Sequence, residues 1–255
     1  MNIKALGIYG NQLKNHKTTT FLINNTLLID AGAITSTLSI KEQAAINNII
    51  LTHSHADHIK DIAFLADNVI GRKPSAIKIY GSKELIENLK KHYLNDKIWP
   101  DFTIIPSSNS PVFQYEEISE GKKFKTCNLT IEAIRTNHPV FTTGLIVSNG
   151  KSTFALSSDT GPTEDFWKKL NNYKKIDTLF VETSFPNNMK ELALLSGHLT
   201  PELLQEELKK FKHLGDTDIY VFHLKPAFEP KLKRELLKLD IPKLHILKQG
   251  QELKI

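Results

Sequence analysis

The sequence predicts a single α/β domain with sheets inside and helices outside. Hairpin patterns dominate the first part of the chain, and strand–helix alternation appears in the middle and towards the end, a combination typical of layered α/β proteins. No linker-like change of composition, internal repeat or low-complexity segment divides the 255 residues. This length is enough for one large domain, so we expect residues 1–255 to form one.

The N-terminal part has the pattern of short strands. Asn24-Asn25 supplies a hairpin turn between two of them. The apolar run 49–51 is expected to end a buried strand, and 59–65 has helical spacing. Three further strands are expected at 3–9, 18–23 and 26–29.

The remaining elements follow from turn and cap signals. Ser82 is a suitable N-cap for a helix at 84–94, and Thr200-Pro201 begins another helix with Pro at its first position. Leu203, Leu204, Leu208 and Phe211 supply the apolar face of that helix. Residues 95–119 are rich in Pro, Ser and aromatic side chains and are expected to be irregular. The other expected elements are strands at 77–80, 129–136, 145–148, 151–157, 176–182, 218–223 and 243–247 and a helix at 230–239.

Composition restricts the classes of function. The chain is 40% hydrophobic and 24% charged, with a formal net charge of +5, which fits a solubility surplus or attraction of an anionic substrate. Cys127 is the single cysteine, so neither an internal disulfide nor a multi-thiolate zinc site is available. The N-terminus has no long apolar segment, and no stretch is apolar enough to span a bilayer. We therefore expect a cytoplasmic protein without a membrane partner.

Residues 52–58 read Thr-His-Ser-His-Ala-Asp-His and place four strong metal-binding side chains within six residues. The pattern H-x-H-x-D-H is expected by chance in on the order of one in a thousand such sequences. It falls on a strand-to-helix loop, where α/β proteins usually place active sites. Alternation along the loop points His53 and His55 one way, and Asp57 and His58 turn towards a second point. This arrangement favours two adjacent metal ions.

Three other polar residues follow expected strands: His138, Asp159 and His223. A lone histidine at a strand end is more often a surface or hydrogen-bonded residue. The loop at 53–58 nevertheless needs partners to complete its metal coordination, which favours these three.

Together these residues resemble the metallo-β-lactamase superfamily over essentially the whole chain. The resemblance implies an αββα four-layer sandwich that binds two divalent metal ions. Zinc is the expected metal, and manganese or iron are the alternatives. It implies that Asp159 bridges the ions and that Asp30 either supports a ligand or caps a turn. One ion would be held by His53, His55 and His138, and the other by Asp57, His58 and His223.

Four sequence blocks resemble the class II 3′,5′-cyclic-nucleotide phosphodiesterases: V-E-T-S-F-P at 181–186, S-G-H-L-T-P at 196–201, H-L-K-P at 223–226 and N-D-K-I-W-P-D-F at 95–102. Ala56 departs from the group, which often has Leu there. The resemblance implies hydrolysis of cyclic AMP or cyclic GMP to the 5′-nucleotide by a hydroxide that bridges the metals.

Within this interpretation His198 is the candidate general acid and Glu182 orients its ring. Asp57 is first a metal ligand and also a candidate hydrogen-bond acceptor from the nucleophile. The structural alternatives are a helix-capping role for His198 and a buried ion pair for Glu182.

A substrate-side insertion is expected around 88–120. Trp99 and Phe102 are candidates to stack on the purine, a contact that contributes about 1–3 kcal/mol, or to pack the insertion onto the domain. Ser184 either reaches a phosphate oxygen or bonds its own backbone.

The Glu–His pair also resembles the tRNA 3′-end-processing endonucleases of the tRNase Z group. That resemblance implies a flexible basic arm rich in Gly and Pro, and 88–120, the only sizeable candidate, contains no Gly. A small cyclic nucleotide is therefore the expected partner and a nucleic acid is not; a homodimer is left open. A non-catalytic nucleotide sensor would be expected to have lost ligands, and a lactonase or β-lactamase leaves Glu182 and His198 unexplained.

Overall fold

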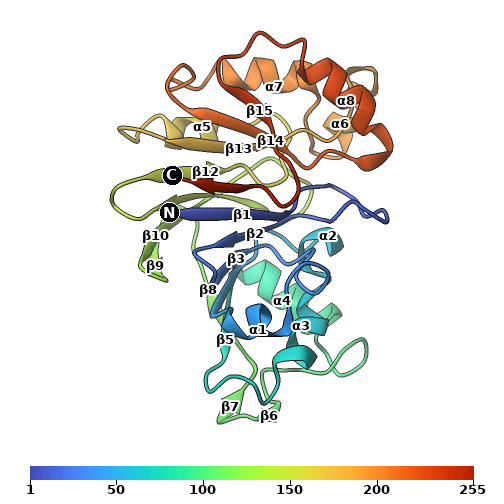
Figure 1. The fold of residues 1–255 in the computed structure, drawn as a ribbon, viewed down its shortest axis with the longest axis vertical. Coiled ribbons are helices and arrows are strands. Elements are labelled where there is room, and N and C mark those ends of the chain that lie inside the picture. The colour runs from blue at the N-terminus through green and yellow to red at the C-terminus, as the bar shows by residue number, and fades with distance from the viewer.

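The chain folds into two mixed β-sheets packed face to face, with helices on the outer face of each (Figure 1). The computed structural model describes residues 1–255 without a gap. The layers follow in the order helix, sheet, sheet, helix, so the predicted αββα sandwich is confirmed. None of the helices is both long and apolar enough to cross a lipid bilayer.

The first sheet combines strands from the N-terminal half with the last strand of the chain. Its order is β16-β1-β2-β3-β4-β5-β8, with antiparallel pairs from β16 to β3 and parallel pairs from β3 to β8. Asn24 and Asn25 both have positive φ in the turn between β2 and β3, a conformation that asparagine tolerates. The strands are β1 (Asn2–Gly7), β2 (Thr20–Ile23), β3 (Leu27–Ile29), β4 (Asn48–Ile50), β5 (Ile77–Gly81), β8 (Phe113–Glu117) and β16 (Glu252–Lys254).

The second sheet comes from the C-terminal half and, like the first, has antiparallel strand pairs on one side and parallel pairs on the other. Its order is β15-β14-β13-β12-β11-β10-β9, antiparallel from β9 to β12 and parallel from β12 to β15. The strands are β9 (Lys123–Thr126), β10 (Leu129–Arg135), β11 (Thr143–Ser148), β12 (Thr153–Leu156), β13 (Thr178–Glu182), β14 (Asp218–Phe222) and β15 (Leu244–Ile246).

The helices α1, α3 and α4 cover the first sheet, and α5, α7 and α8 cover the second (Figure 1). Two predicted N-caps are confirmed: the Ser82 hydroxyl accepts from Leu85 N–H, and Thr200 accepts from Leu203 N–H. The helices are α1 (Ile40–Ala45), α2 (Ala56–Ile59), α3 (Ile62–Val69), α4 (Lys83–His92), α5 (Asp165–Leu170), α6 (Lys190–Leu195), α7 (Pro201–Leu208) and α8 (Glu229–Leu236), with single 3₁₀ turns at Asn187–Met189 and Pro226–Phe228.

Both faces of the first sheet are buried, and each face belongs to a different hydrophobic core. Side chains alternate across a strand: Phe21 and Ile23 of β2 join the core that includes the second sheet, whereas Leu22 joins the core beneath the helices. In β4, Ile50 and Ile49 divide in the same way. Each such side chain contributes roughly 1.5–3 kcal/mol when buried, so the cores hold the strand ends firmly in place.

Residues 95–119 contain more regular structure than the sequence predicted. The irregular segment that we expected includes β8, which pairs with β5, and a small hairpin of β6 (Pro106–Ser107) and β7 (Ser110–Pro111). In β8 Phe113 is buried whereas Gln114 is exposed, but this alternation lies next to Pro and Ser, which argue against a strand. Five other elements were also not predicted: α1, α5, α6, β9 and β16.

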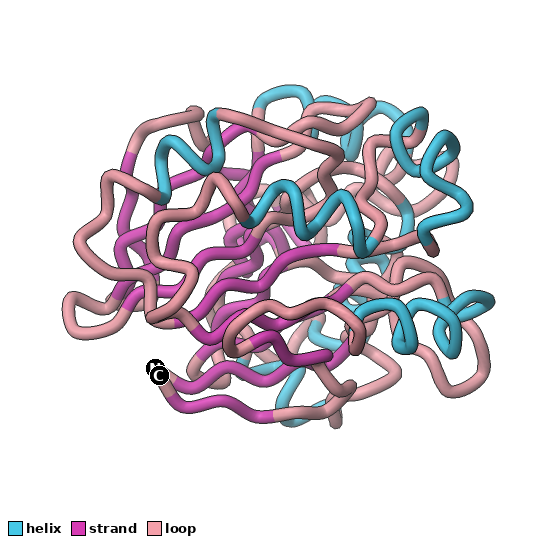
Figure 2. The backbone as a smooth tube through the Cα atoms, turned by 90° about the horizontal axis from the view of Figure 1, so that it is seen from above, coloured by secondary structure: helices cyan, strands magenta, loops and turns pink.

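The carboxyl ends of several strands meet at one edge of the sandwich. β10, β12, β13 and β14 run in the same direction, and β1 and β3 run parallel to each other in the first sheet. Figure 2 shows the strands side by side. Both chain termini lie at the start of β1, which is the end of that strand remote from this edge. Residues that follow these strands are therefore brought together although they are far apart in the sequence.

Candidate metal centre

The cluster at 52–58 lies between β4 and α2, as the sequence predicted. His53 is fully buried, His55 is the N-cap residue of α2, and Asp57 and His58 lie in the first turn of that helix. The helix expected at 59–65 is therefore divided between two helices: α2 begins earlier, inside the cluster itself, and α3 follows at 62–69. The ring of His53 lies 4.7 Å from that of His55 and 4.1 Å from that of His58, measured between centroids.

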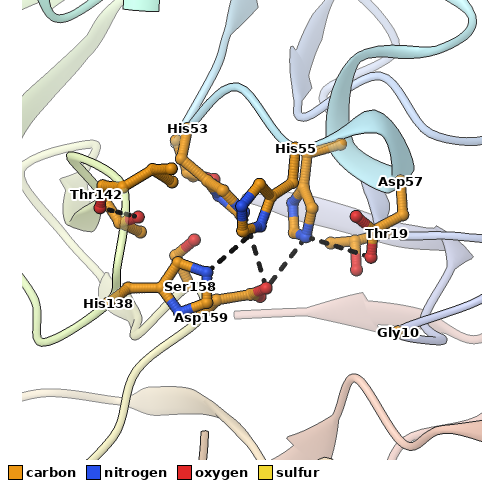
Figure 3. Close-up of polar contacts among 12 residues, drawn as sticks. Gly10, Thr19, His53, His55, Asp57, His138, Thr142, Ser158 and Asp159 are labelled. Atoms are coloured by element: carbon orange, nitrogen blue, oxygen red, sulfur yellow. Dashed lines mark hydrogen bonds and ion pairs between the residues drawn. The ribbon is translucent and has the colours of Figure 1, made fainter. Parts of the chain in front are cut away.

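Asp159 lies among these histidines, directly after β12 (Figure 3). Its carboxylate oxygens are 3.5 Å from His53 Nε2, 3.3 Å from His58 Nε2 and 3.2 Å from His223 Nε2. Its position between the two parts of the cluster is the one that a bridging ligand needs.

The ligand atoms form two adjacent sets, each within 4.8 Å of one another. His138, after β10, completes the first set, with Nε2 3.2 Å from His55 Nδ1. All seven predicted ligands are therefore brought together. One set is His53, His55, His138 and Asp159; the other is Asp57, His58 and His223; a third, overlapping set joins Asp159 and His223 to His198.

Three buried atoms in the centre have no hydrogen-bond partner: His53 Nε2, His58 Nε2 and Asp159 Oδ1. Leaving such a group unsatisfied costs roughly 1–3 kcal/mol. Divalent cations shared by imidazole nitrogens and carboxylates would satisfy all three. Because the donors are imidazoles and carboxylates without a thiolate, they fit a pair of zinc-type ions, with manganese or iron as alternatives.

The opposite nitrogen of most ligand imidazoles is held by a hydrogen bond, which fixes the ring and its tautomer. Asp30 accepts such a bond from His58 and another from Thr52 N–H, so it supports a ligand, the first of its two predicted roles. The bonds are His53 Nδ1 with Thr52 Oγ1 (3.1 Å), His58 Nδ1 with Asp30 Oδ2 (2.7 Å), His138 Nδ1 with Gly197 O (2.9 Å) and His223 Nδ1 with Thr19 Oγ1 (2.9 Å). These roles of Thr19 and Gly197 were missed: no local pattern distinguishes Thr19, and the block at 196–201 that contains Gly197 was interpreted only through His198.

Burial controls the charge of the centre. Burial lowers the pKa of His53 well below the usual imidazole value and also lowers the pKa of His55 and His138. Burial alone would raise the pKa of Asp159, but the charges of the surrounding imidazoles outweigh it and hold this pKa well below its usual value. Burial alone would also lower the pKa of His58, but the nearby carboxylates, Asp159 first, outweigh it and raise this pKa well above its usual value. The neutral imidazoles and the ionised carboxylate are the forms that bind metal, whereas His58 has to lose its proton to do so.

Gly10 lies so close to His223 that no side chain fits between them: a Cβ would lie 2.6 Å from His223 Nε2. We expect Gly10→Ala to displace this ring and to weaken metal binding roughly 10–100-fold, as loss of an outer support does. Calorimetric titration with Zn²⁺ measures the effect. Gly215→Ala is the matched control because a Cβ there meets nothing within 4 Å. Equal affinities of the two variants would contradict the prediction.

A polar pair lies beside the ligands. Glu182 ends β13 and is fully buried, and its Oε1 accepts a hydrogen bond of 2.8 Å from His198 Nδ1. Burial alone would lower the pKa of His198, but the charge and hydrogen bond of Glu182 outweigh it and raise this pKa. The Ser184 hydroxyl and the Thr160 N–H also donate to the carboxylate. With Nδ1 engaged, His198 presents Nε2 to the centre.

The ligands lie at the base of a polar cavity of about 560 Å³. Lys60 and Lys225 bring positive charge to its wall; Lys60 pairs with Asp61, whereas Lys225 contacts Gly10 O at 3.3 Å. Both lysines were missed, although each comes two residues after a ligand. The lining residues are Gly10, Asn11, Gln12, Thr18, His55, Ala56, Asp57, Lys60, His138, Pro139, Asp159, Ser196, His198, His223 and Lys225.

Two predicted aromatic contacts lie elsewhere. The ring of Trp99 packs against Phe64 of α3, with 5.3 Å between centroids, and does not line the cavity, so stacking of Trp99 on a base is not supported. Phe102 is buried beside Phe113 in the smaller core, which confirms the packing alternative.

Ser184 does not reach the cavity either. Its side chain is fully buried, and its hydroxyl lies 3.0 Å from Glu182 Oε2 and 3.3 Å from His198 Nδ1. The contact with a phosphate oxygen, one of the two predicted roles, is therefore not supported, and this hydroxyl supports the Glu182–His198 pair from behind. The sequence did not reveal this because the surroundings of Ser184 come from distant segments: its N–H donates to Leu199 O, and its hydroxyl donates to His223 O at 3.2 Å.

Comparison with known proteins agrees with the fold and the centre. Residues 25–224 match the β-lactamase superfamily domain. The match covers most of the chain, and the chain belongs to the metallo-β-lactamase superfamily.

Among curated proteins, the chain is similar to a probable 3′,5′-cyclic-nucleotide phosphodiesterase of Yersinia pestis, with 27% identity over 208 residues that cover 72% of this chain and 59% of that protein. The match thus spans less than two thirds of the Yersinia protein. A 3′,5′-cyclic-nucleotide phosphodiesterase of Aliivibrio fischeri is 22% identical over 280 residues, covering 87% of this chain and 82% of that protein.

Similar solved structures extend over the whole chain. Unliganded yeast PDE1 superposes with a TM-score of 0.85 at 20% identity, covering 100% of this chain and 99% of that one. The metallo-β-lactamase fold protein YhfI of Bacillus subtilis gives 0.79 at 22%, covering 99% and 98%. The short form of human tRNase Z gives 0.73 at 19%, covering 100% and 99%. At these identities the likeness shows the fold alone.

Proposed function

We propose that this metal-dependent hydrolase cleaves 3′,5′-cyclic nucleotides, cyclic AMP or cyclic GMP, to 5′-nucleotides. The observation that carries the proposal is the 2.8 Å hydrogen bond between Glu182 and His198 beside the two ligand sets. His198 lies outside the two main ligand sets, so this bond does not simply fix a ligand ring as the Asp30–His58 bond does. Cleavage of a phosphodiester with a basic leaving group needs a proton donor held in such a place.

The need arises from the leaving group. Opening the cyclic diester at its 3′ oxygen releases a strongly basic alkoxide, which requires a proton as the bond breaks. His198 lines the cavity with Nε2 free, and Glu182 favours the protonated imidazole that delivers the proton. Ser184 holds Glu182 in place by donating to its other oxygen.

The rest of the site fits an anionic diester. A pair of divalent ions, of which zinc is the expected metal, supplies Lewis acidity when bound and lowers the pKa of water. Asp57, a quarter exposed, lies 3.7 Å from both His58 Nε2 and His223 Nε2, where it would hold a metal ion and could accept a hydrogen bond from the attacking water. Lys225, which forms no ion pair, attracts the phosphate.

The names of the Yersinia and Aliivibrio relatives support this choice of substrate. The second candidate is RNA 3′-end cleavage, which the likeness to human tRNase Z favours. The hairpin β6–β7 is the one regular element of 88–120 outside the two large sheets and α4, and Figure 1 places it at the far end of the lower layer from α2. This distance from the ligands supports the cyclic nucleotide.

Purified protein loaded with Zn²⁺ or Mn²⁺ tests the proposal. We offer it cyclic AMP, cyclic GMP, a pre-tRNA and a β-lactam in parallel and separate the products by chromatography. The expected product is the 5′-nucleotide from at least one cyclic nucleotide, with no cleavage of the other two compounds. His53→Ala protein, prepared identically, controls for contaminating enzymes. Cleavage of pre-tRNA without 5′-nucleotide formation would establish the alternative instead.

A further inference from the structure

A second cavity adjoins the metal cavity. It measures about 420 Å³ and shares Ala56 and Lys60 with the larger one. It lies between the start of α2 and the C-terminal part of α4, on the side away from Lys225 and His198, which line only the larger cavity. A molecule held over the metal ligands therefore has room to extend past Ala56 into this space.

The two cavities differ in chemistry. Ala56 is the one hydrophobic residue that lines the metal cavity, whereas Ile59 and Tyr93 add apolar surface in the second. Asn88 and His92 add hydrogen-bonding groups to the second cavity, and the Asn88 amide donates to Ser54 Oγ at 3.2 Å. Apolar surface with a few polar groups is suited to a flat heteroaromatic ring with polar edges.

The wall of the second cavity is preformed. The Tyr93 hydroxyl donates to Lys60 O at 2.6 Å, which ties α4 to the loop after α2. The Lys60 ammonium is engaged by Asp61 at 2.6 Å, so this cavity has no free cation that would favour a second anion. A neutral aromatic group therefore fits it better than another phosphate, and little ordering is needed to bind one.

We propose that this second cavity binds the nucleobase of the substrate, with the phosphate held over the metal ligands. The inference rests on the proposed function and assigns the base contacts to Tyr93, Asn88 and Ile59 in place of Trp99. Ala56 is important because it lines both cavities at their junction, with a side chain of a single methyl group. A leucine at this position would narrow the junction and is compatible with the first turn of α2.

Binding of adenosine, which has a base but no phosphate, tests the inference without relying on catalysis. We would measure it by equilibrium dialysis with radiolabelled adenosine on zinc-loaded protein of verified metal content. Ala56→Leu should raise the adenosine Kd by about tenfold because it fills space, and Asn88→Ala should do so by a similar factor, the scale of one lost hydrogen bond. The matched controls are Ala45→Leu on α1 and Glu87→Ala, next to Asn88 and outside both cavities.

A kinetic measurement separates the subsite from the reaction. Asn88→Ala should raise KM for cyclic AMP by a similar factor and leave kcat/KM unchanged for ribose 3′,5′-cyclic phosphate without a base. Failure of the wild type to bind adenosine, or equal affinities in the wild type and Ala56→Leu, would overturn the subsite even if cyclic AMP is hydrolysed. Retained adenosine binding without hydrolysis would support the subsite and overturn the proposed function.

Discussion

Replacing His198 by Ala should slow hydrolysis of cyclic AMP by about 10²–10⁴-fold, the usual contribution of a general acid, while two metal ions remain bound. The reason is that Nδ1 of His198 is held by Glu182 at 2.8 Å, which leaves Nε2 to deliver the proton. Steady-state kinetics together with metal analysis of the dialysed protein measure both quantities.

The leaving group makes this test specific. Bis(p-nitrophenyl) phosphate releases a weakly basic phenolate that needs no proton, so His198→Ala should be much less impaired with it than with cyclic AMP. His245→Ala, an exposed histidine of β15 that faces Asp218, is the matched control and should behave as the wild type does. A fall in metal content would contradict the assignment and would instead make His198 a ligand together with Asp159 and His223, the overlapping set in the centre.

Replacing Asp159 by Asn should reduce the bound metal to less than two equivalents and abolish detectable hydrolysis. The amide keeps the shape of the side chain but removes the negative charge that three buried imidazoles face at 3.2–3.5 Å. Metal analysis after dialysis and thermal unfolding with and without Zn²⁺ check the result, because a ligand that binds only the folded state raises its stability, by about 2.7 kcal/mol at a hundredfold excess over Kd.

Asp177→Asn is the matched control for Asp159→Asn. Asp177 is a partly exposed carboxylate before β13 that pairs with Lys175, outside the cavity. Its replacement should leave the Zn²⁺-dependent rise in melting temperature unchanged. An Asp159→Asn protein that retains two equivalents of metal would remove Asp159 from its bridging position.

Local chemistry made the ligands predictable. The cluster at 53–58 is contiguous, and His138, Asp159 and His223 each follow an expected strand, so strand direction alone brings them to one edge. The turn at Asn24-Asn25 and the caps at Ser82 and Thr200 were also predictable, because each depends on one residue and its nearest neighbours.

Features that depend on distant packing were not predictable. β16 has three residues and is defined by its pairing with β1, at the opposite end of the sequence. Trp99 belongs to a block that resembles phosphodiesterases, yet its ring faces α3. Ser184 follows a strand as the ligands do, but the chain that packs around it closes it off from the cavity. A position at a strand end therefore places a residue near the site, but it does not determine whether its side chain faces the cavity or is buried.

The ligands are divided between the two sheets: those at 53–58 follow β4 of the first sheet, and His138, Asp159 and His223 follow strands of the second. Any ion coordinated from both groups acts as a cross-link between the halves of the sandwich and closes loops that span much of the chain. Because the two groups of ligands come together only in the folded chain, the free energy of metal binding is gained only on folding. The ions that activate water would thus also hold the two sheets together at the edge where the ligands lie. The supply of metal would therefore govern the lifetime of the folded protein as well as its rate of turnover.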